Sequence, residues 1–178
     1  MYRKLDDLGN MIQMKKSEIK NLKKNVTFKF ENFADYLEDM IPKKSTVYNM
    51  KLKTTDKSEL FIKDGKALFF KWEKQCMPTL RVLHQYPHTM KKMTVDKGAI
   101  KFVLGGAHIM CPGLTSPGGN IVDCEEGEFV AIHAEDKEHA LAIGVTMMSS
   151  EEIKSVNKGI GIHVLHYVGD GLWTIDLD

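Results

Sequence analysis

The fold of this chain is decided by residues 95–114, which read VDKGAIKFVLGGAHIMCPGL. The spacing of the apolar residues predicts a short helix over residues 95–104, with Thr94 as its N-cap. Two glycines end that helix, and Gly105 suits the left-handed C′ position. A strand is expected to follow over residues 107–111, bounded by a proline and a glycine. The stretch therefore predicts a helix that runs into a strand through a joint of small residues.

RNA binding is one interpretation of the chemistry of this joint. Small residues let a sugar-phosphate backbone approach the main chain closely, and exposed N–H groups there would bond phosphate or sugar oxygens. Lys97 and Lys101 lie four residues apart on the predicted helix and would add positive charge at the same place. A β-α-β joint with two solvated lysines is the other interpretation, and it fits the same residues.

Before this stretch, helical and strand-like patterns alternate. Residues 15–30 carry apolar residues at helical spacing between lysines, which predicts an amphipathic helix. Asn32 is the expected cap of a second short helix, which Pro42 ends. Residues 63–66 contain Asp-Gly between two strand-like runs and predict a type I′ hairpin. Pro78 is expected to open a third helix.

After residue 114, strand-like patterns dominate. Residues 129–134 are expected to pair with residues 140–147 across a polar turn. Ser149 begins a capping box and therefore a short helix. A last pair of strands is expected over residues 162–168 and 172–177. Several short strands with brief helices are typical of a small, partly open β-barrel.

Length and pattern together predict an α+β protein of two domains. A chain of 178 residues allows one domain or two small ones. The boundary is expected in the proline-flanked connection between His88 and Met93. We therefore expect an N-terminal mixed α/β domain over residues 1–91, followed by the β-barrel with short helices over residues 92–178.

The net charge of +1 conceals an uneven distribution of charged side chains. Residues 1–57 hold 13 basic and 8 acidic side chains, a net charge of +5. Residues 123–178 hold 12 acidic and 3 basic side chains, whereas residues 91–108 have a net charge of +3. This asymmetry predicts two faces with different partners, and a local basic patch in an otherwise acidic barrel.

Nothing in the sequence predicts catalysis, a metal or another cofactor. The nucleophile elbow, the zinc-protease helix, the phosphate loop and the dinucleotide fingerprint are all absent. The three cysteines lie far apart with no CxxC pair, which indicates reduced thiols in the cytoplasm. No run of about 18 apolar residues occurs, and the N-terminus lacks the apolar region of a signal peptide. Neither a membrane span nor secretion is expected.

Beyond these patterns, residues 95–118, 157–162 and 166–173 resemble the motifs of the PUA domain, an RNA-binding module. The motifs at residues 78–81 and 86–87 precede them. This combination resembles one family in particular, the malignant T-cell-amplified sequence family, also called translation machinery-associated PUA proteins. The resemblance implies a PUA-type β-barrel preceded by the N-terminal domain of that family.

The resemblance also implies a non-enzymatic RNA-binding translation factor. Proteins of this family pair with density-regulated protein and act on the small ribosomal subunit in non-standard initiation, reinitiation and recycling. The expected partners are therefore a density-regulated-protein homologue, the small subunit, and ribosomal RNA or tRNA. The RNA-binding residues that the family pattern implies lie at the glycine joint and in the last strand: Lys97, Lys101, Gly105, Gly106, Ala107, His108, Met110, Pro112, Gly113, Leu114, Leu172 and Trp173.

Several alternatives stay open at this point. The chain could be an RNA-modification enzyme or its targeting subunit, or a protein-interaction module whose PUA surface no longer binds RNA. Trp173 fits a barrel-closing core residue as well as a stacking platform. The loop at Lys43 and Lys44 could contact ribosomal RNA or only solubilise a helix end. Residues 119–128 are more acidic than the family pattern leads us to expect, which leaves open whether that loop faces RNA.

Overall fold

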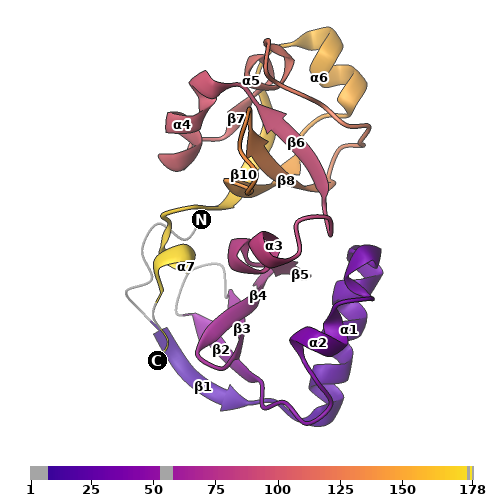
Figure 1. Cartoon of the computed structure of the whole chain (residues 1–178), viewed down its shortest axis with the longest axis vertical. Helices are drawn as coiled ribbons and strands as arrows, with labels where there is room; N and C mark the ends of the chain where they lie inside the picture. Colours follow the sequence, from indigo (N-terminus) through magenta and orange to yellow (C-terminus); the bar gives the residue numbers. More distant parts are fainter. Residues whose placement is uncertain (1–7, 53–57, 176, 178) are drawn as a thin grey trace. The chain divides into compact units, whose positions relative to one another are not determined.

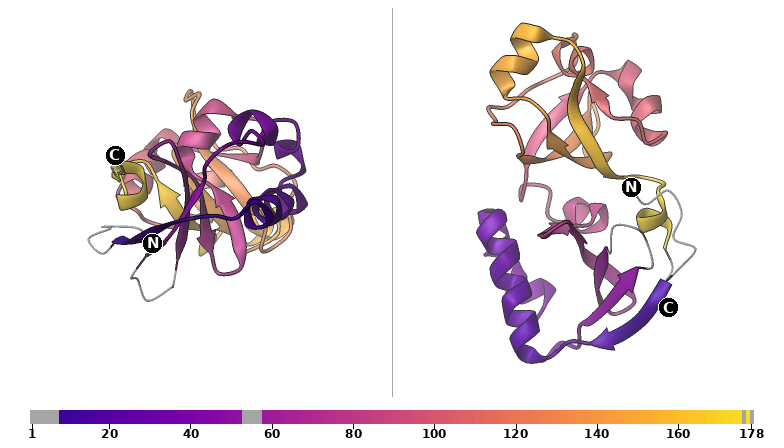
Figure 2. Two further views of the ribbon diagram at one scale, coloured as in Figure 1. Left: turned by 90° about the horizontal axis from the view of Figure 1, so that it is seen from below. Right: turned by 180° about the vertical axis from the view of Figure 1, so that it is seen from behind.

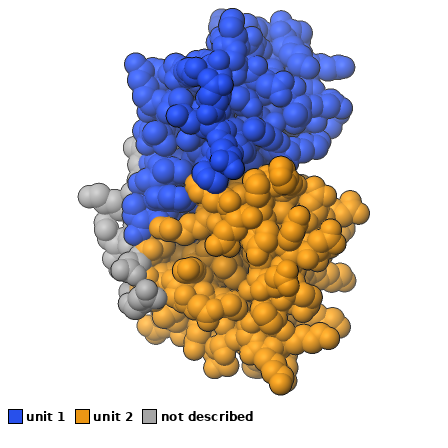
Figure 3. Space-filling model, viewed as in Figure 1, with its two compact units in different colours: residues 1–3, 90–174 blue, residues 4–89, 175–178 orange. Residues whose placement is uncertain are grey.

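The computed structural model describes residues 8–52, 58–175 and 177. Contacts divide the chain into two compact units, which Figure 3 colours separately. In chain order, the first unit (orange, unit 2 in the key of Figure 3) comprises the described residues through Thr89 together with Ile175 and Leu177, and the second (blue, unit 1 in the key) comprises Met90–Thr174. Each unit contains one five-stranded sheet with short helices, which confirms the α+β class.

The sheet of the first unit is an antiparallel ribbon in the order β1-β2-β3-β4-β5. Its turn between β3 and β4 is the predicted hairpin, since Asp64 and Gly65 have φ angles of 48° and 67°. Both values are positive, as a type I′ turn requires. The strands are β1 (Leu8–Gln13), β2 (Tyr48–Leu52), β3 (Glu59–Lys63), β4 (Lys66–Trp72) and β5 (Gln75–Pro78).

The helices of the first unit are α1 (Lys16–Lys29), η1 (Glu31–Phe33), α2 (Leu37–Met40) and α3 (Leu80–Gln85). The long helix α1 confirms the amphipathic pattern, because Leu22 and Val26 are buried on one face while its lysines lie outside. Figures 1 and 2 show α1 lying beside α2 along one side of the sheet.

Two expectations about helix starts in this unit are wrong. Asn32 lies inside η1, and its side-chain amide donates to the carbonyl of His88 at 3.2 Å instead of capping a helix. Pro78 ends β5, and Thr79 takes the N-cap position of α3. The extended backbone at Pro78 pairs with Phe69, so a strand contact overrides the helix-opening preference of proline.

The sheet of the second unit has the order β6-β8-β9-β10-β7 and curls around a core that includes Met93, Val130, Ile132 and Val164. Only the pair β6–β8 is parallel among these strands. The pairing of β8 with β9 and the capping box at Ser149 are both confirmed. The strands are β6 (Lys91–Val95), β7 (Ile109–Met110), β8 (Phe129–Ala134), β9 (Ala142–Thr146) and β10 (Ile160–Tyr167).

The helices of the second unit differ from the expected ones at three places. Residues 91–95 form β6, and Asp96 is the N-cap because its carboxylate accepts from the N–H of Ala99 at 3.1 Å. Residues 111–115 form α5 where the end of a strand was expected. Residues 172–174 belong to α7, so the last strand of the predicted pair is absent there. These helices are η2 (Lys97–Ala99), α4 (Ile100–Leu104), α5 (Cys111–Thr115), α6 (Ser150–Val156) and α7 (Gly171–Thr174).

Candidate nucleic-acid interface

The joint between α4 and β7 depends on Gly106, not on Gly105. Gly106 has a φ of +78°, whereas Gly105 has a φ of −83° and continues the right-handed turn, which corrects the expected C′ position. A Cβ at Gly106 would lie 2.8 Å from the ring of Tyr167. Backbone conformation and close packing both require glycine here.

The backbone N–H groups of this joint form hydrogen bonds within the chain. Those of Gly105, Gly106 and Ala107 donate at 2.9–3.1 Å to the carbonyls of Lys101, Phe102 and Val103. The expectation that these N–H groups would bond phosphate or sugar oxygens is therefore wrong. The joint therefore leaves the side chains around it as the groups that could contact a ligand.

A predominantly apolar groove lies where α4, β7, α5 and the start of β10 meet, with a volume of about 670 Å³. Three large apolar side chains in its lining are exposed, namely Phe102 at 58%, Met110 at 50% and Ile160 at 40%. An exposed apolar cluster of this kind marks a binding surface. We call it the apolar groove, and its lining comprises Asp96, Gly98, Ala99, Phe102, Val103, Ala107, His108, Ile109, Met110, Pro112, Gly113, Ser116 and Ile160.

The two lysines predicted to contact phosphate differ in their surroundings. The ammonium of Lys97 lies 2.7 Å from Oδ2 of Asp136, and this hydrogen bond raises the pKa of Lys97. The ammonium of Lys101 lies 5.0 Å from the ring centroid of Phe102, over a side chain that lines the apolar groove. Lys101 therefore places a positive charge beside the groove, whereas the charge of Lys97 is balanced by a carboxylate.

The other predicted residues divide between groove and core. Ala107, His108, Met110, Pro112 and Gly113 line the apolar groove. Leu114 and Leu172 are buried, so their side chains support the fold and offer no surface to RNA. Trp173 is half-buried on α7, and its backbone N–H donates to Oδ1 of Asp170 at 2.8 Å. Gly105, Gly106, Leu114, Leu172 and Trp173 lie outside the lining.

His108 occupies the groove in a fixed orientation. Its Nδ1 accepts from the N–H of Val164 at 3.1 Å, and its ring lies over that of His163 with centroids 4.0 Å apart. Burial, followed by the proximity of His108, lowers the pKa of His163. This environment therefore favours the neutral form of His163.

Sequence reasoning missed Phe102 and Ile160. A signal for Phe102 is present in the sequence, because it stands off the face shared by Ala99 and Val103 on the predicted helix. An apolar residue on the outer face of a short helix indicates a contact surface. Ile160 gives no comparable signal, since its place beside Met110 depends on the pairing of β10 with β7.

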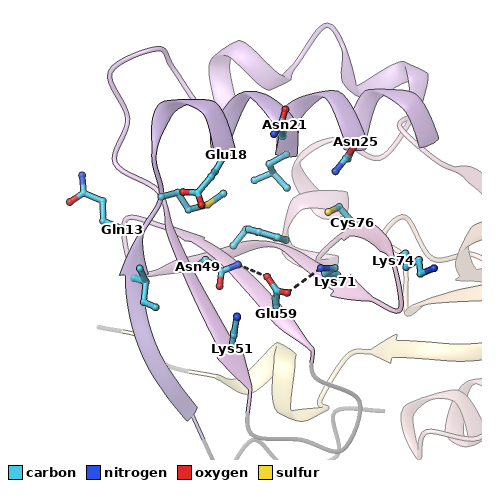
Figure 4. Close-up of a pocket in the computed structure, with 14 residues that line it drawn as sticks. Gln13, Glu18, Asn21, Asn25, Asn49, Lys51, Glu59, Lys71, Lys74 and Cys76 are labelled. Atoms are coloured by element: carbon cyan, nitrogen blue, oxygen red, sulfur yellow. Dashed lines mark hydrogen bonds and ion pairs between the residues drawn. The ribbon is translucent and has the colours of Figure 1, made fainter.

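The first unit contains a second, more polar cavity under α1 (Figure 4). Neighbouring strands bring Lys51, Glu59 and Lys71 side by side, and the carboxylate of Glu59 accepts from Asn49 at 2.7 Å and from Lys71 at 3.1 Å. Burial alone would raise the pKa of Glu59, but the hydrogen bonds from Asn49 and Lys71 hold the pKa below its usual value. The carboxylate is thus engaged within the fold, and we interpret this network as structural.

Within the described residues, no group of three His, Cys, Asp or Glu side chains is placed to hold a metal ion. Among these same residues, every helix is too short or too polar to cross a membrane.

Comparisons with known proteins cover nearly the whole chain. The Pre-PUA-like domain model matches residues 2–87, and the PUA domain model matches residues 91–168. Malignant T-cell-amplified sequence 1 of Danio rerio is 46% identical, over 97% of both chains. Translation machinery-associated protein 20 of Saccharomyces cerevisiae is 42% identical over the full length of both. A hypothetical protein from Pyrococcus horikoshii, whose crystal structure is known, shares the fold with a TM-score of 0.73 and 24% identity, over 92% of this chain and 98% of its own.

Proposed function

The chain belongs to the family of malignant T-cell-amplified sequence and translation machinery-associated PUA proteins, and we propose that it is a non-enzymatic RNA-binding translation factor. Its site of action is the small ribosomal subunit, in non-standard initiation, reinitiation and recycling. It works in the cytoplasm as a heterodimer with a density-regulated-protein homologue. The support for this role and partner is the family relationship over nearly the whole chain.

The observation that supports RNA binding most strongly is the apolar groove with a cation at its edge. Phe102 presents a ring on which an unpaired base can stack, a contact that contributes about 1–3 kcal/mol, and Met110 and Ile160 extend the apolar surface beside it. Lys101 lies beside Phe102 and is placed to meet the phosphate that accompanies a stacked base. The mechanism we propose is therefore positional: the groove holds bases, and the lysine holds the backbone.

Lys97 can contact a phosphate in this mechanism only if it leaves its carboxylate partner. Its ammonium is paired with Asp136, so it binds a phosphate only by exchanging one anion for another. We therefore assign the stronger phosphate contact to Lys101. Gly105 and Gly106 influence RNA binding only through the shape of the joint. Trp173 lies outside the groove lining, so we assign it no contact with RNA in the groove.

The proposal is tested by binding a fluorescently labelled tRNA transcript to two matched variants of α4. Phe102→Ala removes an exposed apolar side chain that lines the groove, and Leu104→Ala removes one that does not. We expect Phe102→Ala to bind about tenfold more weakly, because one base no longer has a ring to stack on. We expect wild-type affinity for Leu104→Ala. Equal affinities for the two variants would remove the groove from the RNA-binding surface.

Two further measurements address the role in translation. Affinity purification of the chain from cell lysate should recover small ribosomal subunits together with a density-regulated-protein homologue. Incubation with tRNA should leave every nucleoside unmodified. Turnover of any nucleoside would instead support the RNA-modification alternative.

A further inference from the structure

A second groove, in the first unit, has five lysines among its twelve lining residues. It has a volume of about 510 Å³ and lies between α1 and the loop that follows α2. Lys16, Lys20 and Lys23 come from α1, while Lys43 and Lys44 come from the loop. Glu38 is the acidic residue in its lining. We call this surface the basic groove.

The positive charge of the basic groove is largely unbalanced. Lys23 donates to the carboxylate of Glu38 at 2.8 Å. Lys16, Lys20, Lys43 and Lys44 are exposed, and none of them forms an ion pair with another residue that the structure describes. Lysines gathered around one concavity without counter-charges repel one another and raise the local concentration of anions. A folded chain keeps such an arrangement most readily where a polyanion offsets the repulsion.

An aromatic side chain continues the row of lysines along α1. Lys16, Lys20, Lys24 and Phe28 follow one another at four-residue intervals in a row that turns by about 40° per step around α1, so Lys24 and Phe28 lie beyond the groove lining. Phe28 is 90% exposed, although a phenylalanine gains nothing from contact with water. Successive members of this row rise by about 6 Å along the helix axis, so each lysine can meet a different phosphate.

We propose that the basic groove and Phe28 form a second RNA-binding surface, which holds the phosphates of a single strand with lysines and stacks one base on the phenylalanine. This inference rests on the proposed function, since it assigns a further surface to an RNA-binding protein. Lysine charge alone would also suit an acidic protein segment. The exposed ring of Phe28 on the same helix as three of the groove lysines favours RNA, because proteins bind single strands without base specificity by combining a basic groove with aromatic side chains.

The test uses the full chain and a fluorescein-labelled oligouridylate, with affinity measured against salt concentration, and a labelled polyglutamate peptide as the acidic-protein probe. One variant replaces the four unpaired lysines of the groove by alanine: Lys16, Lys20, Lys43 and Lys44. A matched control replaces four exposed lysines outside it: Lys66, Lys74, Lys137 and Lys154. Both variants remove the same net charge, so a difference between them reports position. Circular dichroism melts of both verify that they fold.

The groove variant is expected to bind oligouridylate at least about tenfold more weakly. Its slope of log affinity against log salt should flatten by up to about 0.7 for each phosphate that the variant no longer binds. The control should keep most of the wild-type slope. Phe28→Ala should bind about tenfold more weakly with no change in slope, and Phe28→Trp should restore binding, because stacking is insensitive to salt. Glu38→Gln should strengthen binding, since it frees Lys23.

Three outcomes would overturn the inference. Equal slopes for the groove variant and the control would mean that position within the groove does not matter. A groove variant that no longer binds polyglutamate but still binds RNA would assign the groove to an acidic protein. In both cases the tRNA result for Phe102→Ala still decides the proposed function separately. A wild-type chain that binds neither oligouridylate nor tRNA would overturn the inference and the proposed function together.

Discussion

The apolar groove of the second unit and the basic groove of the first unit are similar in size but opposite in chemistry. The apolar groove exposes Phe102, Met110 and Ile160 beside one available lysine, whereas the basic groove gathers five lysines around one glutamate. On the proposed roles, base stacking in the first depends little on salt and its one lysine adds a single salt-dependent contact, whereas binding to the second should weaken steeply as salt rises. The difference teaches that a net charge of +1 says little about the local surface, because positive charge and exposed apolar side chains are concentrated in different grooves.

The largest expected effect comes from removing the joint that supports the apolar groove. Gly106→Ala forces a side chain into a left-handed backbone conformation and against the ring of Tyr167, 2.8 Å away. These two costs together predict a decrease of about 3 kcal/mol in the free energy of unfolding. Chemical denaturation of the variant measures this decrease.

The control for this prediction is the same substitution at Gly113, a glycine that lines the apolar groove. Gly113→Ala would place its Cβ 3.6 Å from that of Ala99, an ordinary contact, with no positive φ. Its stability should stay within about 0.5 kcal/mol of wild type. If both variants unfold alike, Gly106 has no special structural part. The basic groove lies in the other unit, so a Gly106→Ala variant that folds should keep the salt-dependent binding of oligouridylate.

An intermediate effect on tRNA binding is expected from adding an available positive charge to the second unit, as the first unit already has in its basic groove. Asp136→Asn frees Lys97 from its 2.7 Å ion pair and adds one available cation. Asp136 has a φ of 58°, a conformation that asparagine also tolerates, so the turn should be kept. The variant should bind tRNA more tightly, with a salt dependence steeper by up to about 0.7. An unchanged slope would show that Lys97 contacts no phosphate even when it is unpaired.

Much of the fold could be predicted from the sequence, whereas the rest depends on pairing between distant strands. The helix at residues 16–29 and the hairpin at Asp64–Gly65 follow from local periodicity and turn chemistry, and both are confirmed. The position of the joint is predicted correctly, but the helix start at Thr94 is wrong, because the strand-forming role of residues 91–95 comes from parallel pairing with β8. Local patterns do not specify such a partner.

The candidate site shows the same limit. The predicted residues Ala107, His108, Met110, Pro112 and Gly113 line the apolar groove, whereas the equally predicted Leu114 is buried. Short α5 turns the side chain of Leu114 inward, and the sequence does not predict that helix because Cys111 reads as the end of a strand and Pro112 and Gly113 as its boundary. Periodicity cannot assign a segment of five residues, so the faces of short elements come only from the structure.

The smallest expected effect is a pH dependence of stability that comes from His163, whose ring stacks on that of His108 at the apolar groove. Burial and then His108 lower the pKa of His163 in the folded chain, so the unfolded chain binds the proton more readily. Stability should therefore be complete above the ordinary histidine pKa of about 6.5 and should fall as the pH drops below it, until His163 is protonated in the folded state as well.

His163→Gln should flatten this dependence, because it removes the titrating ring while keeping a polar side chain. Thermal melts of wild type and variant between about pH 5 and pH 8 measure the difference. The basic groove has no histidine in its lining, so oligouridylate binding by its lysines should change little over the same range. A variant that keeps the full pH dependence of the wild type would place the titrating group elsewhere. The two grooves would then differ in their response to salt but not in their response to protons.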